Sequence, residues 1–179
     1  DMDKDIIKKV VALAKQYNKK LYGVVSNMSI AVERRDFLKH FDCFICNQLE
    51  AGMLFMEDYA DKSPEELRDI LSKRVILGKI PAMIVTMGGN GAVYADVNGE
   101  KGICPPQRVR VKDTTGAGDA FIGSFLYQLY EDGITVNDLD KISMEQMKRY
   151  LDFSNTYCGK SVLKQGVIAS YPDMNEMRS

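Results

Sequence analysis

The sequence predicts an α/β layered domain with a mostly parallel sheet and an antiparallel hairpin at one side. Short runs of apolar and β-branched residues alternate with longer stretches in which apolar residues recur at helical spacing. Asn98-Gly99, between two of the short runs, is a strong signal for a tight hairpin turn. The length of 179 residues suits one domain with a sizeable core.

Elements of the first half alternate between helix and strand. Residues 3–17 carry apolar side chains at helical spacing, with lysines on the other face. Ser63-Pro64-Glu65-Glu66 combines a capping serine, a proline at the first helical position and acidic residues in the first turn, so a helix begins there. In chain order we expect a helix over 3–17, a strand over 21–25, a helix over 31–39, a strand over 43–46, a helix starting near Gln48, a helix over 63–77 and a strand over 83–86.

The second half changes rhythm, because a glycine turn and short strands come first. In chain order we expect a turn over 88–91, hairpin strands over 92–95 and 101–104, a strand over 109–111, a helix over 117–130, a loop over 133–142, a helix over 144–163 and a short helix after Pro172. No internal repeat or linker divides the chain, so one domain is expected.

Charge and composition argue against several classes of function. The formal net charge of −1 gives no electrostatic support for binding nucleic acid or a membrane surface. No apolar run is long enough to span a bilayer, and the charged N-terminus lacks a signal-peptide pattern. The four cysteines indicate reduced thiols, which predicts a cytoplasmic protein. Cys43 and Cys46 lie three apart on one predicted strand and therefore point to opposite faces, so a shared metal or a disulfide is not expected.

Residues 111–121 join a predicted strand to a predicted helix through a turn of small residues. A helix N-terminus offers unpaired backbone N–H groups and a partial positive charge, so it can hold an anion. Gly116, Ala117 and Gly118 have little side chain to obstruct a ligand that approaches this backbone. Asp119 places a carboxylate in the first helical turn, which is electrostatically awkward beside an anion. Our hypothesis is that Asp119 acts on the group that attacks a phosphate.

Two further strand ends carry polar or glycine-rich segments, and such ends lie at the same edge of a parallel sheet. Asn47 and Glu50 are spaced to share one face of a helical turn, where their oxygens suit either a hydrated Mg²⁺ with its phosphates or a simple helix cap. Residues 86–91 fit either a nucleotide-binding turn or a plain hairpin connection. Neither glycine turn has the Lys and Ser or Thr of a P-loop. Phe121 stands where a dinucleotide fingerprint needs a glycine, which disfavours an NAD-dependent oxidoreductase.

Residues 113–121, Asp-Thr-Thr-Gly-Ala-Gly-Asp-Ala-Phe, match residue for residue the C-terminal signature of the ribokinase-like (PfkB) sugar and nucleoside kinases, and the chain resembles that family. Residues 47–50 resemble its Asn-x-x-Glu motif, and residues 86–91 resemble its Thr-x-Gly-x-x-Gly nucleotide turn. Residues 155–172 resemble the helix and loop that close over the adenine. The resemblance implies a ribokinase-like layered α/β/α sandwich with the N-terminal part and the lid missing.

The resemblance also implies roles in the transfer of the ATP γ-phosphoryl group to an alcohol. Asp119 would be the general base that takes the proton from the substrate hydroxyl. The backbone N–H groups of residues 116–118 would form the anion hole. Asn47 and Glu50 would organise Mg²⁺ and the phosphates through water, so that Glu50 is an indirect metal ligand. The ATP site would be lined by Thr86, Gly88, Gly91 and Asn155.

In ribokinase-like members a monovalent cation lies next to the anion hole, and here K⁺ is the candidate. The resemblance assigns this cation to two segments of the chain. Its matching positions are Asp113 and Thr115, the backbone carbonyls of Ser161, Lys164 and Gly166, and Ser170.

The family fold is roughly twice as long as this chain. We therefore expect residues 1–179 to be the C-terminal portion of a single ribokinase-like kinase domain, with Asp1 midway through the fold and no counterpart of the sugar-receiving glycine pair or the β-lid. The expected substrate is a small molecule, a sugar or sugar-like alcohol. One alternative is a nucleoside kinase, such as a pseudouridine or adenosine kinase, because residues 27–31 are similar to a segment of pseudouridine kinases. Another alternative is a non-catalytic nucleotide-binding fragment.

A sheet with an uncovered strand or face is liable to pair with another chain. We therefore expect the isolated chain to self-associate or to be poorly soluble, and a homodimer is one form that association could take.

Overall fold

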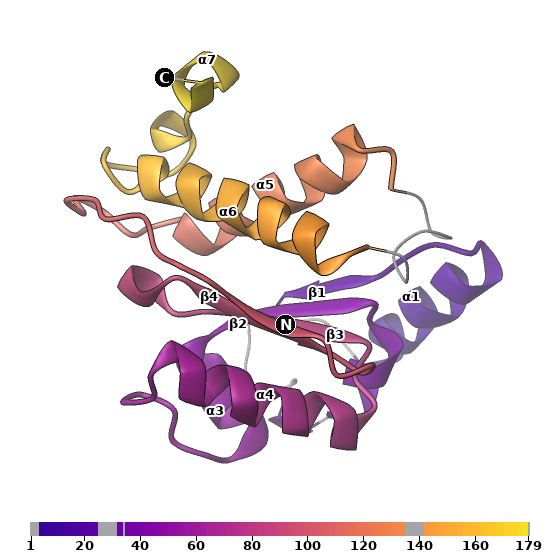
Figure 1. The fold of residues 1–179 in the computed structure, drawn as a ribbon. Helices are drawn as coiled ribbons and strands as arrows, with labels where there is room; N and C mark the ends of the chain where they lie inside the picture. The colour runs from indigo at the N-terminus through magenta and orange to yellow at the C-terminus, as the bar shows by residue number, and fades with distance from the viewer. Residues whose placement is uncertain (1–3, 25–31, 34, 135–141, 179) are drawn as a thin grey trace. The chain divides into compact units, whose positions relative to one another are not determined.

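In a computed structural model, the structure describes residues 4–24, 32–33, 35–134 and 142–178 (Figure 1). The chain divides into two compact units. The first consists of Asp1–Thr86 and Val93–Gly102, and the second of Met87–Ala92 and Ile103–Ser179. None of the helices in the described ranges is both long and apolar enough to cross a membrane.

The described residues contain a five-stranded sheet with the strands in sequence order. β1 and β3 both pair with β2 in parallel, so that Ile45 lies between Val24 and Ile84. Short turns join β3 to β4 and β4 to β5. A parallel pair would need a long crossover connection instead, so β4 is antiparallel to the other strands. The strands are β1 (Tyr22–Val24), β2 (Cys43–Asn47), β3 (Ala82–Thr86), β4 (Ala92–Asp96) and β5 (Lys101–Cys104).

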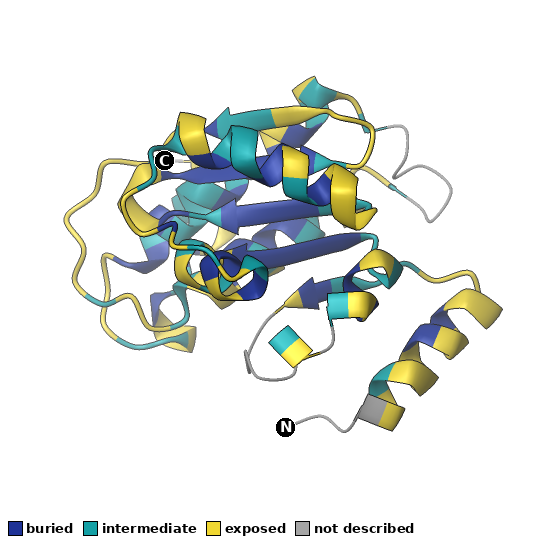
Figure 2. Ribbon diagram, turned by 90° about the horizontal axis from the view of Figure 1, so that it is seen from below, coloured by how far each residue is buried: buried dark blue, intermediate teal, exposed yellow. Residues whose placement is uncertain are grey.

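The core of the first unit lies between the central strands and two helices on one face of the sheet (Figure 1). These helices are α3 (Gln48–Phe55) and α4 (Pro64–Gly78). Figure 2 shows the central strands as buried, whereas α1 (Lys4–Gln16) is largely exposed. Burial of each large apolar side chain contributes about 1.5–3 kcal/mol. The fully buried residues of the strands and helices include Ile45, Leu54, Leu67, Leu71, Val75, Met83, Ile84 and Val85.

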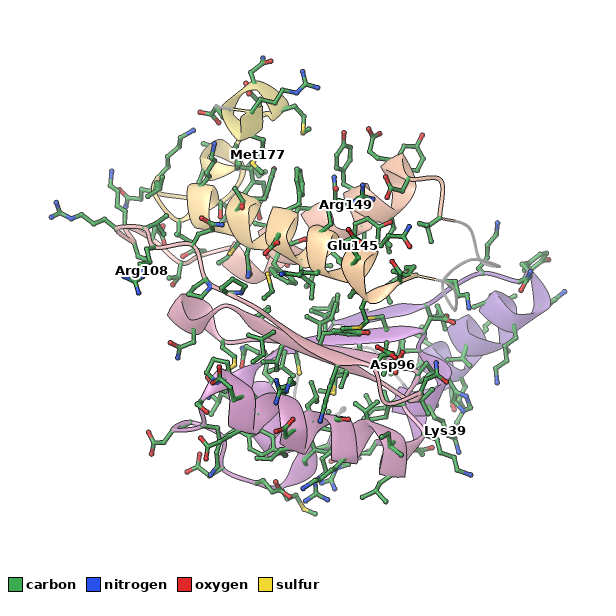
Figure 3. All side chains as sticks on the ribbon, viewed as in Figure 1. Lys39, Asp96, Arg108, Glu145, Arg149 and Met177 are labelled. Atoms are coloured by element: carbon green, nitrogen blue, oxygen red, sulfur yellow. The ribbon has the colours of Figure 1, made fainter. Side chains whose placement is uncertain are left out.

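Two long helices form the core of the second unit. In α5 (Ala117–Glu131) and α6 (Met144–Ser161), the buried rings of Phe125 and Tyr150 meet edge to face with 6.4 Å between their centroids. The Tyr150 hydroxyl donates to Asp132 at the end of α5 over 2.6 Å, and the neighbouring Arg149, labelled in Figure 3, donates to the same carboxylate. The unit also holds the 3₁₀ helices η2 (Gly88–Asn90) and η4 (Ile168–Ser170) and the short helix α7 (Met174–Arg178).

Three helices begin with a reciprocal cap. Asn47, Ser63 and Ser143 each accept a hydrogen bond from the backbone N–H three residues on, and the side chain at that position accepts from the backbone N–H of the cap. Two unpaired donors of the helix start are satisfied in this way. The start predicted for α4 at Ser63-Pro64 is thus confirmed.

Most predicted elements are confirmed within a residue or two at each end, and the strand predicted over 109–111 is wrong. Residues 107–112 are exposed and belong to no strand. The backbone N–H groups of Lys112 and Asp113 donate to the carbonyl of Val162 instead of to a neighbouring strand. Residues 109–111 therefore belong to no strand, although β-branched residues alternate there.

Two other predictions need qualification. The helix expected over 31–39 is α-helical at residues 32–33 and a 3₁₀ helix, η1 (Arg35–His40), after that, while residues 31 and 34 lie outside the described residues. Most of the loop expected over 133–142 and the segment 27–31 that resembles pseudouridine kinases also lie outside them. The helix expected to reach residue 163 ends at Ser161.

Candidate active site

The predicted site residues are distributed over both units. Asn47, Glu50 and Thr86 belong to the first unit. All the others belong to the second unit: Gly88, Gly91, Asp113, Thr115, Gly116, Ala117, Gly118, Asp119, Asn155, Ser161, Lys164, Gly166 and Ser170.

The turn before α5 depends on glycine at position 116. Gly116 has φ +76°, a left-handed conformation that glycine adopts without strain. A Cβ at this position would lie 2.7 Å from Cγ1 of Val167 and 2.9 Å from the hydroxyl oxygen of Tyr171. Gly118, by contrast, has no neighbour within 4 Å of such an atom, so the backbone there is open to a ligand.

The backbone N–H groups at this helix start are not equivalent. The N–H of Ala117 donates to the carbonyl of Thr114 over 3.1 Å. Those of Gly116 and Gly118 make no hydrogen bond within the described part of the chain. The start of α5 therefore presents two free donors and the positive end of the helix dipole, which together suit an anion.

Asp119 lies in the first turn of α5 and is exposed. Its carboxylate makes no hydrogen bond or ion pair within the described residues, so it can accept a proton from a ligand. The pKa of the Tyr171 phenol is raised, mainly by burial and in addition by the negative charge of Asp119.

Asp113 ties the turn to a distant loop. Its Oδ1 accepts from the N–H and the hydroxyl of Thr115 over 2.9 and 2.7 Å, and its Oδ2 accepts from the N–H of Gly166 over 3.0 Å. These hydrogen bonds, the one from Gly166 first, lower the pKa of Asp113 to about 2, so the carboxylate is ionised at neutral pH.

Of the other residues assigned to a monovalent cation, Ser161 ends α6, and Lys164 and Ser170 lie, like Gly166, in the segment that follows it. The hydroxyls of Ser161 and Ser170 are buried and donate to the carbonyls of Cys158 and Val167 over 2.8 and 2.6 Å. Lys164 uses its side chain for an ion pair with Glu176. The carbonyl oxygens and hydroxyls of this loop are donor types that suit a hard cation, which fits the expected K⁺. A group of three or more His, Cys, Asp or Glu residues able to hold a metal is not found within the described ranges.

Asn47 and Glu50 form the reciprocal cap of α3. Asn47 Oδ1 accepts from the N–H of Glu50 over 2.9 Å, and Glu50 Oε2 accepts from the N–H of Asn47 over 2.8 Å. The cap that the sequence allowed is therefore present. It leaves the amide nitrogen of Asn47 and Oε1 of Glu50 without a hydrogen bond in the described part of the structure. Thr86, on the neighbouring strand, points its hydroxyl to the carbonyl of Cys46 at 3.5 Å.

The glycine turn between β3 and β4 is closed by the backbone. The N–H of Met87 donates to the carbonyl of Gly91 over 2.7 Å, and the N–H of Gly91 donates to that of Gly88 over 3.1 Å. Gly88 and Gly91 have φ +54° and +87°. A Cβ on Gly91 would lie 2.1 Å from the carbonyl oxygen of Cys104, so no other residue fits there.

Asn155 is held by a partner that the sequence analysis missed. Its Nδ2 donates to the carbonyl of Pro105 over 3.0 Å and to Sγ of Cys104 over 3.1 Å, and the Cys104 thiol donates to Asp152 over 2.9 Å. Burial, followed by the contact with Asp152, raises the pKa of this thiol. No local pattern points to Cys104, since Asn155 lies 51 residues away.

Tyr171 is a second residue that the sequence analysis missed. Its hydroxyl donates to the carbonyl of Gly116 over 3.3 Å across 55 residues of sequence. Residues 107–112, which precede the turn and from which Arg108 extends in Figure 3, are exposed.

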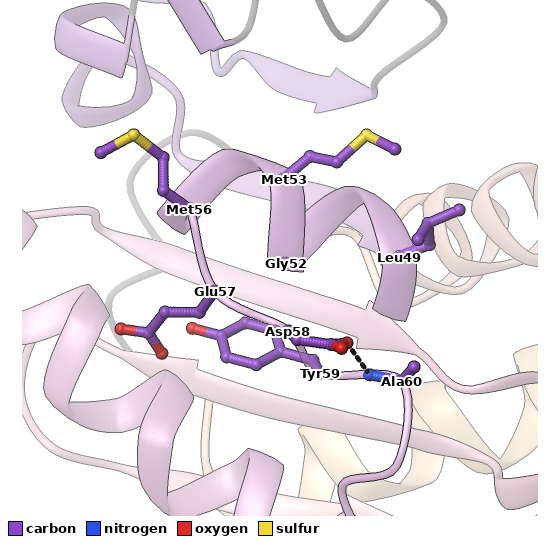
Figure 4. Close-up of a pocket in the computed structure, with 8 residues that line it drawn as sticks. All are labelled: Leu49, Gly52, Met53, Met56, Glu57, Asp58, Tyr59 and Ala60. Atoms are coloured by element: carbon purple, nitrogen blue, oxygen red, sulfur yellow. Dashed lines mark hydrogen bonds between the residues drawn. The ribbon is translucent and has the colours of Figure 1, made fainter.

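A shallow hollow of about 280 Å³ lies at the C-terminal end of α3 (Figure 4). It contains none of the predicted site residues. Its lining consists of Leu49, Gly52, Met53, Met56, Glu57, Asp58, Tyr59 and Ala60.

A mostly parallel α/β sheet, glycine-rich turns and a helix start with two free N–H groups beside a carboxylate are features that suit the binding of an anion. Residues 1–174 match the family described as pfkB family carbohydrate kinase, and the chain belongs to this family. It is 30% identical over 135 residues to guanosine-inosine kinase of Exiguobacterium acetylicum, covering 74% of this chain and 43% of that protein. It is 27% identical over 142 residues to ribokinase of Schizosaccharomyces pombe, covering 79% and 41%.

Among solved structures, fructokinase of Xylella fastidiosa with bound ATP matches with a TM-score of 0.80 and 18% identity, over 97% of this chain and 55% of that one. This likeness confirms the expected ribokinase-like layered fold. The chain spans less than half the length of the two curated relatives.

Proposed function

We propose that this chain is the C-terminal portion of a single ribokinase-like kinase domain that transfers the γ-phosphoryl group of ATP to an alcohol of a sugar or sugar-like substrate. The observation that carries the proposal is the start of α5. There, two free N–H groups, those of Gly116 and Gly118, precede an exposed carboxylate, Asp119. The N–H groups of Gly116 and Gly118 would hold the anion, and Asp119 would act on the incoming nucleophile.

The proposed chemistry follows from this arrangement. Asp119 takes the proton of the substrate hydroxyl. The oxygen of that hydroxyl attacks the γ-phosphorus, and the bond between the γ-phosphorus and the bridging β-phosphate oxygen breaks. The N–H groups of Gly116 and Gly118 stabilise the charge on the transferring oxygens. Ala117, whose N–H is directed to Thr114, joins the anion hole only if that hydrogen bond opens.

The remaining residues bind rather than react. Glu50 and Asn47 have unbonded polar atoms that suit a hydrated Mg²⁺, which would neutralise phosphate charge. The glycine turn and Asn155 would line the nucleotide. Asp113 and the loop that follows α6 would hold K⁺. The four free thiols support a reducing compartment such as the cytoplasm.

Two alternatives remain open to test. The guanosine-inosine kinase among the relatives favours a nucleoside as phosphate acceptor. The short span of the chain relative to its relatives favours a fragment that binds nucleotide without catalysis.

Replacing the proposed base tests the mechanism. Asp119→Asn should lower kcat by about 10²–10⁴-fold and leave binding of Mg·ATP largely intact, because the amide cannot take the proton. The rate of phosphorylation would be measured against a panel of sugars and nucleosides, for this chain and for any longer polypeptide that contains it. Asp61→Asn is the matched control, since Asp61 is exposed and makes no hydrogen bond or ion pair within the described residues. Near-normal turnover of Asp119→Asn would show that Asp119 is not the base.

Calorimetric titration separates the alternatives. Binding of Mg·ATP with turnover of a sugar supports the main proposal, and preference for a nucleoside supports the first alternative. Binding without turnover by this chain supports the nucleotide-binding fragment. Failure to bind ATP would contradict all three.

A further inference from the structure

The segment that follows α6 contacts the turn before α5 at several successive points. The carbonyl of Val162 accepts from the N–H groups of Lys112 and Asp113 over 2.8 and 3.3 Å. Further on, Gly166 donates to Asp113, and Tyr171 donates to Gly116. The turn is therefore held at both ends by one segment.

The contact with Tyr171 falls on the peptide unit between Gly116 and Ala117. The carbonyl of this unit accepts from the N–H of Ala120 over 2.8 Å and from the Tyr171 hydroxyl over 3.3 Å. Its N–H donates to Thr114 over 3.1 Å. A trans peptide is planar and rotates as one body, so bonding on both sides fixes its orientation. The N–H groups of Gly116 and Gly118 belong to the two adjoining peptide units, so their directions depend on this orientation together with the dihedral angles of Gly116 and Ala117, of which Gly116 has φ +76°.

Tyr171 is itself held in place by neighbouring rings and backbone. Its ring lies 6.3 Å from that of Tyr157, which stacks with Phe153 at 6.4 Å, and Phe153 stacks with Tyr127 at 6.3 Å. The N–H of Tyr171 donates to the carbonyl of Ile168 over 3.3 Å. The row of rings and this turn set the direction in which the hydroxyl points.

We propose that Tyr171 is a positioning residue of the phosphate-binding turn: its hydroxyl holds the Gly116–Ala117 peptide so that the free N–H groups of Gly116 and Gly118 are preset for the transferring phosphoryl group. The phosphate-binding part of this inference rests on the proposed function. Donors fixed before the reaction cost no reorganisation when charge develops, which is why positioning affects the rate. The phenol remains protonated, and so remains a donor, because burial raises its pKa.

Tyr171→Phe tests the inference, because it removes the hydroxyl and keeps the ring in its row. Tyr157→Phe is the matched control: it removes a phenol hydroxyl from the same row that makes no hydrogen bond within the described residues. Amide hydrogen exchange at Ala117 and Ala120 reports directly on the peptide that Tyr171 holds. We expect exchange about two- to tenfold faster in Tyr171→Phe than in wild type, as loss of one hydrogen bond allows, and no change in Tyr157→Phe. Equal exchange in the two variants would overturn the inference.

The functional part has its own readout. If Tyr171 presets the donors, Tyr171→Phe should lower kcat about two- to tenfold with little change in KM for ATP, because the lost effect belongs to the transition state. An unchanged kcat, or a change confined to KM, would reject the positioning role. If wild type binds no Mg·ATP, the proposed function fails, and the exchange measurement still decides whether Tyr171 holds the turn.

Discussion

Asp113 illustrates how one carboxylate organises a turn. It accepts three hydrogen bonds, two from Thr115 and one from Gly166, and none comes from a charged side chain. Donors of this kind favour the ionised form, and they join two segments 53 residues apart. The carboxylate thus stabilises the turn only while it is ionised.

The stability of the chain should therefore depend on pH through Asp113. Its pKa is lowered to about 2 in the folded state from an ordinary value of 3.8. A lowered folded pKa gives stability that is present above the unfolded pKa and is lost as pH falls through the folded one. We expect Asp113→Asn to flatten the fall in unfolding free energy between about pH 4 and pH 2, measured by urea unfolding at a series of pH values. Asp61→Asn should retain the wild-type profile; the same steepness in both variants would contradict the assignment.

At the scale of residues, the sequence predicts the roles that depend on neighbours in the chain. The small residues of the turn and the carboxylate at position 119 were recognisable because spacing along a strand–turn–helix places them together. Tyr171 and Cys104 were not, because their partners lie 55 and 51 residues away and hydroxyl and thiol contacts leave no local pattern. The division of the N–H groups between Ala117 and its neighbours was equally invisible, since it depends on the turn's dihedral angles.

At the scale of elements, α3 and α4 begin with the same kind of cap, but only the start of α3 is proposed to belong to the active site. Asn47 and Ser63 cap their helices through the same pair of hydrogen bonds. Only Asn47 is also proposed to organise Mg²⁺ and phosphate. The start of α4 therefore serves as a control for the start of α3, and it tests whether the Asn-x-x-Glu segment has a role besides capping the helix.

Exchanging the two caps separates stability from binding. Ser and Asn cap helices about equally well, so Asn47→Ser and Ser63→Asn should each change the unfolding free energy by no more than about 0.5 kcal/mol. Asn47→Ser removes an amide group from the proposed site and should weaken Mg·ATP binding about two- to tenfold. Calorimetric titration and urea unfolding of both variants make the comparison. If Asn47→Ser binds Mg·ATP as tightly as wild type, Asn47 only caps the helix.

The predictability of elements follows the same physical distinction. Helix starts with a capping residue and strands with a buried apolar run were predicted, because cap and burial are encoded locally. The strand over 109–111 was predicted from the same β-branched pattern and was wrong, because a strand also requires a neighbour, and its neighbour is chosen by the rest of the fold.

At the scale of the whole molecule, the first unit exposes apolar surface on α1 and at Tyr17 directly after it. Ile6, Val10, Leu13 and Tyr17 are between 41% and 63% exposed and recur at helical spacing. In the same unit, β1 is an edge strand of the sheet that the described residues form, and Val24 is also exposed. Both features favour association with another chain. Self-association of the isolated chain, with a homodimer as one form, stays a prediction.

Charges placed on α1 should suppress this association. We expect wild type to show a molar mass that rises with concentration in light scattering, and Ile6→Lys with Leu13→Lys to lower it towards the monomer, because burial of a lysine ammonium is costly. Leu77→Lys is the control, since Leu77 is 77% exposed on α4 and outside this surface. A wild-type chain that is monomeric at all concentrations would contradict the prediction.

The layered α/β architecture could be predicted for the whole chain because strand and helix periods alternate so regularly. The division into two compact units could not, because the boundary falls within β4 and β5, which the sequence presents as one hairpin.

That division gives the cysteines a practical meaning. Cys43 and Cys46 belong to the first unit, and Cys104 and Cys158 to the second. Burial raises the pKa of all four thiols. Cys43, Cys46 and Cys104 are buried, so an alkylating reagent must wait for these three to be uncovered and ionised, whereas Cys158 is only partly buried. Each unit therefore contains at least one buried thiol that reports on its opening. Pulsed alkylation followed by mass spectrometry of each cysteine peptide would compare the opening rates of the two units, and it needs no substitution.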